Sequence, residues 1–553
     1  MNRTARIARP TVNAAVLADA HADLAPVAVA AREGLSLHLF AGSFVLYMVL
    51  SYILIVHLKF LYVDTVARTI HAWYVLWGNG APHMAAIGFI WMPLPTLFQI
   101  PFMVHPVMGT SVIAGGLMSA ICMAATTTAV DGSLRMMQLS NRVRWTLVAL
   151  FALHPMILMY GANGMSEAML MATAAFCSYF YVKWLNTRAI TSLSLLSVSA
   201  AGAILTRYEG FALAAAAVAL VLIAYTWDFF LERHARHHTF TDLGIHLEGV
   251  AITALGAPVY AAMIWVYANW IIMGDPFFFL RGTYSNAAQI AFAPREVIAL
   301  RFDLGSTSVF ALTRIFQIEA IFIPATLLAM LLLLRRRQVL KIGALLLPFS
   351  LLVFSWLTLF LGQSYGWFRF FIYAIPGATL AVGVIIQALG TQRLLARALV
   401  LLLLLGVLGS NLAAARAILN PRIGREEFAA VEALLEWKPV DASTTVEAKV
   451  AAWVRERVID RDVLMDDFSG REIIRLTGTT HPFVLGVDRD FEEILTFPQG
   501  RVRYVLVPRP DNLGSLDAIN RRYPGLFDGL AGFAELEQDW GEWRLFRVRA
   551  RGG

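Results

Sequence analysis

Charged residues are scarce in this chain. Asp, Glu, Lys and Arg make up 15% of its 553 residues, whereas an average soluble protein contains about 25%. The deficit is uneven, because residues 1–415 contain 25 Lys and Arg and 15 Asp and Glu, and residues 416–553 contain 20 and 23. The first part is therefore too apolar for a soluble domain, and the second is not. This composition excludes a soluble enzyme, a disordered protein and a nucleic-acid-binding protein with a basic surface.

Cysteine is scarce as well. The two cysteines, Cys122 and Cys177, both lie inside apolar runs. Two such residues cannot build a disulfide framework, and they do not have the spacing of a zinc site. The HExxH spacing is absent too, so we predict no dedicated zinc site. Residues 1–36 contain no cleavable apolar core, and we expect them to form a cytoplasmic N-terminal segment.

Residues 1–415 contain many long apolar runs. A helix needs about 20 apolar residues to cross the hydrocarbon layer of a membrane. We predict a polytopic all-α membrane domain over residues 37–415 with about eleven spans. These are 37–57, 108–130, 146–161, 165–183, 191–206, 210–227, 247–273, 307–333, 342–361, 370–388 and 397–415.

Basic residues predict the orientation of these spans. Cytoplasmic loops collect Lys and Arg. With the N-terminus inside, the inner segments hold 17 of these residues and the outer segments hold eight. We therefore expect an integral plasma (inner) membrane protein whose N-terminus is cytoplasmic and whose residues 416–553 are extracytoplasmic.

Two long loops join spans on the predicted outer side, over residues 58–107 and 274–306. Both are rich in aromatic residues, Gly and Pro, which suits segments that lie at the membrane interface. Long loops in compact proteins are often functional, and these two are too apolar to be disordered. They contain His71 and His83 in the first loop and Asp275 and Arg281 in the second.

The C-terminal part reads as a small α/β domain. Three short apolar segments predict buried strands at 463–465, 483–485 and 502–507, and a hairpin is predicted over 534–548. Helical patterns at 425–437 and 446–458 precede the strands. We find no Gly-rich phosphate fingerprint in this part.

Asp64 is the acid of greatest interest in the first loop, because it follows the first span by only a few residues. If the stretch is helical, Arg68 and His71 share its face. Partial burial would raise the pKa of Asp64 and Arg68 would lower it. A carboxylate held there could act as a general base, or it could cap a helix and pair with Arg68.

Further ionisable groups lie at helix ends, where charge at membrane depth indicates function. Glu167 begins the fourth span, where it could also cap the helix. Arg207 and Glu209 flank a tight turn and could form a local ion pair. Arg369 stands among aromatic residues without an obvious acidic partner, and either a bound anion or a cation–π contact with Trp367 would explain it.

In order and layout, these motifs resemble the C-type (GT-C) integral-membrane glycosyltransferases, which include protein O-mannosyltransferases and the aminoarabinose transferases of lipid A. In that family an acidic residue follows the first span, and a Pro-rich segment comes later in the same loop. Asp64, Tyr74 and Trp91-Met92-Pro93-Leu94-Pro95 stand in that order here. The segments around Glu167, Arg207-Tyr208-Glu209-Gly210, Asp275-Pro276 and Tyr373-Ala374-Ile375-Pro376-Gly377 are also similar to bacterial members. Two features depart from the family. Where the family has a pair of neighbouring carboxylates, this chain has only Asp64, and Trp91 stands where the family has a His.

The resemblance implies a sugar donor linked to polyprenyl phosphate and a glycan, lipid or protein acceptor, with membrane lipid as a further partner. Asp64 would be the general base of an inverting transfer. Fixed cations should stabilise the lipid phosphate as it leaves, with Arg207, Arg281 and Arg369 as candidates. The substrate-binding residues that we predict are Arg68, His71, His83, Glu167, Arg207, Glu209, Asp275, Arg281 and Arg369.

Two other classes of function are compatible with the composition. A lipid or polysaccharide transporter or flippase would also have many spans, although we see no internal repeat. A third possibility is a sensor whose C-terminal domain binds a partner. Such a protein would need only a small membrane anchor, and the membrane domain predicted here is much larger than that. No cofactor is required by the sequence, but Asp64 with Glu167 or Asp275 could hold a divalent cation, Mg²⁺ or Mn²⁺, through oxygen ligands.

Overall fold

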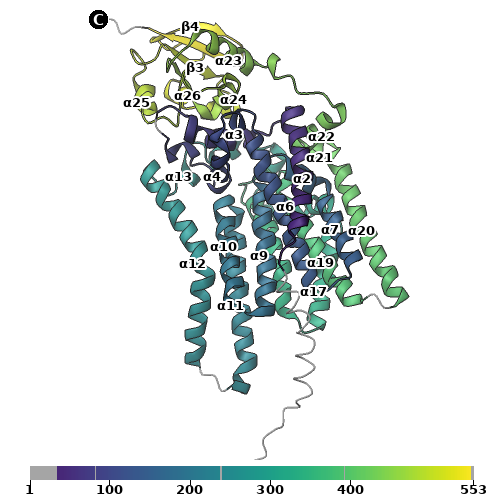
Figure 1. The fold of residues 1–553 in the computed structure, drawn as a ribbon. Helices are drawn as coiled ribbons and strands as arrows, with labels where there is room; N and C mark the ends of the chain where they lie inside the picture. Colours follow the sequence, from purple (N-terminus) through teal and green to yellow (C-terminus); the bar gives the residue numbers. More distant parts are fainter. Residues whose placement is uncertain (1–33, 81, 237–239, 391–392, 550–553) are drawn as a thin grey trace, which may run out of the picture.

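A computed structural model describes residues 34–80, 82–236, 240–390 and 393–549. It shows a bundle of long helices with a small mixed α/β domain seated on one end (Figure 1). We call this end of the bundle the domain-bearing end. The predicted cytoplasmic segment 1–36 lies outside the described residues except for its last three. The fold class expected from the sequence, a polytopic helical membrane protein with a C-terminal α/β domain, is confirmed.

Within the described ranges, eight helical segments are long and apolar enough to cross a membrane. They are α2 with its π-helical extension η1 (Leu37–Ser51 and Tyr52–His57), α6 (Ile113–Met136), α9 (Glu167–Thr187), α11 (Glu209–Arg236), α12 (Phe240–Met273), η5 with α18 (Val339–Ile342 and Gly343–Phe360), η6 with α19 (Phe368–Phe371 and Ala374–Leu389) and α20 (Leu394–Ile418). The chain is therefore a multi-pass integral membrane protein.

Two further predicted spans are each broken into a bent pair of helices. The first consists of α7 (Asn141–Ala152) and α8 (Pro155–Ala162) at 59°, and the second of α16 (Leu304–Ile318) and α17 (Phe322–Arg335) at 91°. His154 lies in the first break, where its Nδ1 accepts from the Met156 amide at 3.1 Å and its Nε2 lies 3.1 Å from the Ile318 carbonyl at the second break. The buried imidazole thus satisfies backbone groups that both bends leave without helical partners.

The fifth predicted span is the short helix α10 (Ile190–Thr206). Its 17 residues extend about 25 Å at 1.5 Å per residue, less than the hydrocarbon thickness of about 30 Å. It packs between α9 and α12 in the bundle. By length and composition, ten of the eleven predicted spans are therefore found, eight as unbroken helices and two as bent pairs, and α10 is the eleventh and shorter helix. Apolar runs indicate burial but not whether a helix is long or straight.

Both long loops fold into short helices at the domain-bearing end. The first contains α3 (Val63–Trp77), η2 (Met84–Ile87), α4 (Leu94–Gln99), η3 (Ile100–Val104) and α5 (Val107–Thr110). The second contains α13 (Phe278–Arg281), α14 (Asn286–Gln289), η4 (Ile290–Phe292) and α15 (Arg295–Ile298). The labelled helices α3, α4 and α13 lie between the bundle and the C-terminal domain (Figure 1).

The C-terminal domain contains one five-stranded sheet of order β2-β1-β3-β5-β4. Its strands are β1 (Val463–Leu464), β2 (Phe483–Val484), β3 (Tyr504–Pro508), β4 (Ala534–Asp539) and β5 (Trp543–Val548). The first three pair in parallel, and the hairpin β4–β5 adds antiparallel to β3. Between the last span and the sheet, α21 (Pro421–Gly424) and α22 (Glu426–Glu436) lie beside the bundle (Figure 1), where Ala430 joins its core. The helices of the domain itself are η7 (Ala442–Thr444), α23 (Val446–Arg457), α24 (Asp467–Thr477), α25 (Phe491–Thr496), η8 (Asn512–Leu516) and α26 (Ala518–Arg522). The strands and the two helices predicted from the sequence are confirmed.

Candidate functional site

Asp64 lies in the first turn of α3, at the domain-bearing end of the bundle. Its side chain is 32% exposed, so a substrate can reach the carboxylate. The next residue, Thr65, is buried and donates its hydroxyl to the Asn163 carbonyl at 2.9 Å. This bond ties the start of α3 to the turn that precedes α9.

Gly164 allows that turn to approach α3 closely. Its φ is +79°, a left-handed conformation, and a Cβ built there would lie 2.3 Å from Cγ2 of Thr65. Only glycine adopts this backbone conformation without strain and leaves room for α3. Glu167, the first residue of α9, thereby reaches the same guanidinium as Asp64, that of Arg369.

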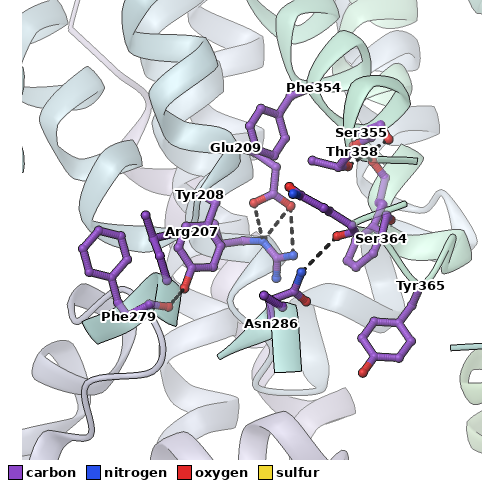
Figure 2. A pocket seen from close by; sticks show the side chains of 14 residues that line it. Arg207, Tyr208, Glu209, Phe279, Asn286, Phe354, Ser355, Thr358, Ser364 and Tyr365 are labelled. Carbon is purple, nitrogen blue, oxygen red and sulfur yellow. Dashed lines mark hydrogen bonds and ion pairs between the residues drawn. The ribbon is translucent and has the colours of Figure 1, made fainter. Parts of the chain in front are cut away.

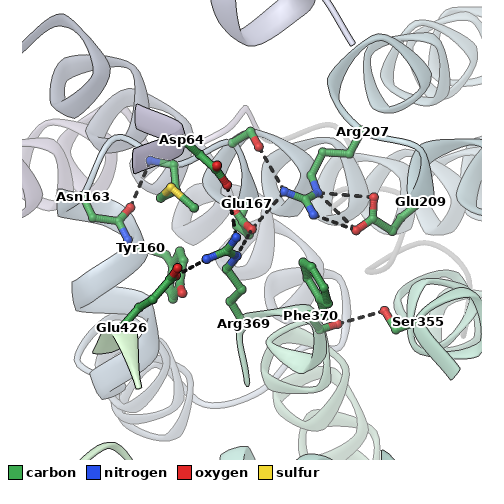
Figure 3. A network of polar contacts seen from close by, with 12 residues as sticks. Asp64, Tyr160, Asn163, Glu167, Arg207, Glu209, Ser355, Arg369, Phe370 and Glu426 are labelled. Carbon is green, nitrogen blue, oxygen red and sulfur yellow. Dashed lines mark hydrogen bonds and ion pairs between the residues drawn. The ribbon is translucent and has the colours of Figure 1, made fainter. Parts of the chain in front are cut away.

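Arg369 joins three carboxylates from three distant parts of the chain (Figure 3). Its Nη2 lies 3.1 Å from Asp64, its Nε lies 3.0 Å from Glu167, and its Nη1 contacts Glu426 at the start of α22. The guanidinium is 1% exposed and stacks on the Trp367 ring with 3.6 Å to its centroid. Arg369 is therefore not the unpaired cation that its sequence neighbours suggested, although the cation–π contact is present.

Arg207 extends this network to a fourth carboxylate. Its Nη1 donates to Glu167 at 2.9 Å and to the Ser166 hydroxyl at 3.2 Å, and its Nη2 donates to Glu209 at 2.9 Å. Glu167 is fully buried between Arg207 and Arg369. Two cations therefore compensate the charge of Glu167, which would otherwise be costly to bury.

Among the arginines of the site, Arg68 has the most guanidinium N–H groups without a hydrogen-bond acceptor among the described residues. One turn after Asp64 on α3, it donates Nη1 to the Met92 carbonyl at 3.0 Å and lies over the Trp91 ring. Within the described ranges it forms no ion pair with a carboxylate within 4.0 Å. Burial lowers the pKa of Arg68 to about 10, so the guanidinium keeps its charge at neutral pH.

These cations keep Asp64 ionised. Burial by itself raises the pKa of this carboxyl, but Arg369, Arg68 and Arg207 outweigh it and hold the pKa below the ordinary value. The carboxylate form, which can accept a proton, is therefore populated at neutral pH.

Glu427 forms a second buried contact beside this network. Its carboxylate accepts from the Tyr160 hydroxyl at 2.5 Å, and the residue is 3% exposed. Burial raises the pKa of Glu427 to about 7, although the hydrogen bond from Tyr160 opposes this. Ionising Glu427 in the folded protein therefore costs free energy.

This pKa predicts a pH-dependent loss of stability that Glu427→Gln should remove. A carboxyl with a raised folded-state pKa stabilises the fold below its ordinary pKa, and this contribution is lost as pH rises to about 7. The shift corresponds to about 3 kcal/mol. We expect Glu427→Gln to have a higher Tm than wild type at pH 8 and an equal Tm at pH 4.5, as measured by thermal scans in detergent. Glu432→Gln, on the exposed face of the same helix, is the matched control, and an equal effect at both pH values would contradict the prediction.

Two neighbouring cavities adjoin the network. The smaller, of about 110 Å³, contains Asp64, Arg68 and Arg369, with Trp91, Gln289 and Trp367 in its wall. The larger, of about 400 Å³, is lined by Phe354, Thr358 and Ser355 of α18, by Asn286 and by Gln363 and Ser364 (Figure 2). Arg207, Tyr208, Glu209, Asn286, Tyr365 and Phe370 line both cavities. Together they offer aromatic faces and neutral amides and hydroxyls beside the Asp64 carboxylate.

The structure separates four of the predicted site residues from these cavities. His71 faces the C-terminal domain, with Nδ1 3.0 Å from the Ala86 carbonyl and Nε2 4.0 Å from Asp467. His83 lies in the segment before η2. Asp275 accepts from the Phe277 amide at 2.9 Å, and the exposed Arg281 lies over the ring of Phe277. None of the four lines either cavity, because the loops fold away from the network at these positions.

The arrangement does not fit the divalent cation that the sequence allowed. Asp275 does not line the cavity that contains Asp64, and Asp64 and Glu167 both face the guanidinium of Arg369. Among the described residues, no three His, Cys, Asp or Glu gather in a group that could hold a metal. The carboxylates of the site neutralise arginines instead.

Sequence reasoning missed Glu426 and Glu427 as members of the site. The signal available was an adjacent acidic pair that begins eleven residues after the predicted end of the last span. We placed it in the C-terminal domain because its pattern predicted a soluble helix. Asn286 and Gln289 were also missed, since neutral residues in a loop carry no distinctive pattern. Tyr208 was named only as part of the turn from Arg207 to Gly210 and not as a site residue.

No protein-family model matches the sequence, and no curated protein matches it. Solved structures do resemble the fold. ArnT from Cupriavidus metallidurans in the apo state superposes with a TM-score of 0.51 at 15% identity, over 92% of this chain and 97% of ArnT. The archaeal oligosaccharyltransferase AglB from Archaeoglobus fulgidus, solved with an inhibitory peptide and a dolichol-phosphate, gives 0.43 at 12% identity, over 91% of this chain and 74% of AglB. The chain thus has, over nearly its whole length, a fold similar to that of ArnT.

Proposed function

We propose that this protein transfers a sugar from a polyprenyl-phosphate donor to a glycan, lipid or protein acceptor at the domain-bearing end of the bundle, with inversion. The observation that carries the proposal is an accessible, ionised carboxylate at the edge of a membrane bundle of ArnT-like fold, with a spare guanidinium beside it. The bias of Lys and Arg supports an extracytoplasmic location for this end in the plasma membrane.

In the proposed reaction, Asp64 accepts the proton of the acceptor hydroxyl or amine. The oxygen or nitrogen then attacks the anomeric carbon of the donor sugar. The bond from that carbon to the phosphate oxygen breaks, and the lipid phosphate leaves with the electron pair. Because the nucleophile enters opposite the leaving group, the configuration at the anomeric carbon inverts.

The leaving phosphate gains negative charge in the transition state, so fixed cations should stabilise it. Arg369 is occupied by three carboxylates, Arg207 by two, and Arg281 lies outside the cavities. Arg68 retains free donors, keeps its charge and shares the smaller cavity with Asp64. We therefore assign the phosphate to Arg68, and we assign to Arg207 and Arg369 the task of holding the carboxylates in place.

Arg68→Ala should weaken donor binding at least tenfold, because a hydrogen bond to a charged group contributes about 1.5–3 kcal/mol. Arg68→Lys, which keeps the charge but not the planar donors, should recover part of the affinity. Binding of a radiolabelled polyprenyl-phosphate sugar to protein in nanodiscs measures this effect. The control is Arg281→Ala, an exposed cation of the second loop. If Arg281→Ala weakened donor binding and Arg68→Ala did not, the lipid phosphate would be assigned to Arg281 and not to Arg68.

The function itself is tested by turnover. Purified protein in lipid nanodiscs is incubated with a series of polyprenyl-phosphate sugars, and transfer to added acceptors or slow hydrolysis of the donor is measured. Release of the lipid phosphate with the sugar inverted supports the proposal. If no donor turned over but fluorescent lipids crossed the membrane of proteoliposomes, the protein would be a lipid translocator instead.

A further inference from the structure

One segment of the second loop forms a wall of both cavities. Asn286 lines the larger and the smaller cavity, and Gln289 lines the smaller. These two amides belong to the short helix α14. A helix of four residues cannot hold itself in place, so tertiary contacts must fix the position of this wall.

Tyr284, two residues before Asn286, makes the main contact. Its ring stacks on Phe468 of the C-terminal domain, with 4.4 Å between centroids and 18° between planes, and its hydroxyl donates to Asp466. The backbone of Tyr284 is also tied to the wall, because Gln289 donates its side-chain amide to the Tyr284 carbonyl at 2.6 Å. Asn286 in turn donates to the Gln363 carbonyl at 2.9 Å.

Asp466 is a rigid anchor for this contact. It caps α24 by accepting from the Phe468 amide at 2.9 Å, and it accepts from the Ala518 amide at 2.7 Å at the start of α26. The residue is 2% exposed. A second contact lies beside it, where Arg521 of α26 donates to the Thr283 hydroxyl at 2.9 Å.

The C-terminal domain also forms hydrogen bonds with the first loop, which carries Asp64. Asn79 donates to the Phe483 carbonyl at 2.8 Å and to Asp488 at 3.1 Å, and Thr480 donates to the Trp77 carbonyl at 2.9 Å. The C-terminal domain therefore binds both loops. The first loop carries Asp64, and the second carries Asn286 and Gln289, which line the same cavity as Asp64.

We propose that Tyr284 is a positioning residue through which the C-terminal domain holds Asn286 and Gln289 in the wall that faces the donor sugar. Their neutral amides suit sugar hydroxyls, which both accept and donate hydrogen bonds. This inference rests on the proposed function, since it names part of the donor site. It assigns the C-terminal domain an indirect part in substrate binding, because the residues that touch the sugar come from the membrane domain.

The test compares Tyr284→Phe, which removes the bond to Asp466, with Tyr523→Phe. Tyr523 makes an equivalent bond to the Leu495 carbonyl at 2.7 Å within the C-terminal domain and away from the loop. The first measurement is limited trypsin digestion in nanodiscs, with mass spectrometry of cleavage after the exposed Arg281, Arg295 and Arg301 of the second loop. The second is the KM for the donor and kcat for each variant. Arg521→Ala provides an independent perturbation if Tyr284→Phe does not accumulate.

We expect Tyr284→Phe to be cleaved in the second loop about tenfold faster than wild type and to have a KM about tenfold higher with kcat changed less than twofold. Tyr523→Phe should resemble wild type in both measurements. Cleavage at the wild-type rate would overturn the contact as a tether, and faster cleavage with unchanged KM would overturn the positioning role. The digestion does not depend on turnover, so failure of the proposed function and failure of the tether are distinguishable.

Discussion

Asp64→Asn should reduce sugar transfer about 10³-fold, the usual range for losing a general base, without loss of folding or donor binding. The amide cannot accept the acceptor's proton, but its oxygen can still accept from Arg369 at the position where Asp64 now lies 3.1 Å away. Arg369 also keeps its contacts with Glu167 and Glu426. The network should therefore survive the change.

This result is measured as the initial rate of transfer in nanodiscs, together with donor affinity and Tm. Asp275→Asn is the matched control, because this outer-loop acid lies outside both cavities. Turnover within tenfold of wild type would show that Asp64 is not the general base. Glu426 would then be the next residue to test, since its side chain is 40% exposed whereas that of Glu167 is fully buried.

Arg369→Ala should destabilise the protein severely, by about 3–5 kcal/mol, because it leaves buried carboxylates without their counter-charge. Glu167 has no exposure at all, and its Oε2 already lacks a hydrogen-bond partner among the described residues. Arg207 alone would then have to balance Glu167 and Glu209 together. We expect little folded protein and a strongly lowered Tm.

The mechanism of this loss can be tested by compensation. Arg369→Met combined with Glu167→Gln removes a cation and the most buried anion together, so the double variant should recover part of the Tm that Arg369→Met loses. Arg301→Ala, which removes an exposed arginine stacked on Phe302, should leave Tm almost unchanged. A wild-type Tm for Arg369→Ala, or a double variant no better than the single one, would show that the network does not stabilise the fold.

The sequence by itself determined the membrane class, the position of most spans and the strands of the C-terminal domain. These features depend on local patterns, because twenty apolar residues or a short apolar run between turns carry their own energetic preference. It also singled out Asp64, Glu167, Arg207 and Glu209, because ionisable groups at helix ends near a membrane cost free energy and therefore indicate a functional site. The local ion pair that it allowed between Arg207 and Glu209 is confirmed.

Only the tertiary structure decided which charges meet. Arg369 binds Asp64, 305 residues away, and Tyr160 binds Glu427, 267 residues away. No periodicity in the chain encodes contacts of such separation; they follow from how helices pack and where loops fold back. For the same reason the sequence suggested an unpaired Arg369 and gave no sign that Arg68 would donate to the Met92 carbonyl. The bends at His154 and after Ile318, and the contact of Tyr284 with the C-terminal domain, were likewise set by packing between distant elements.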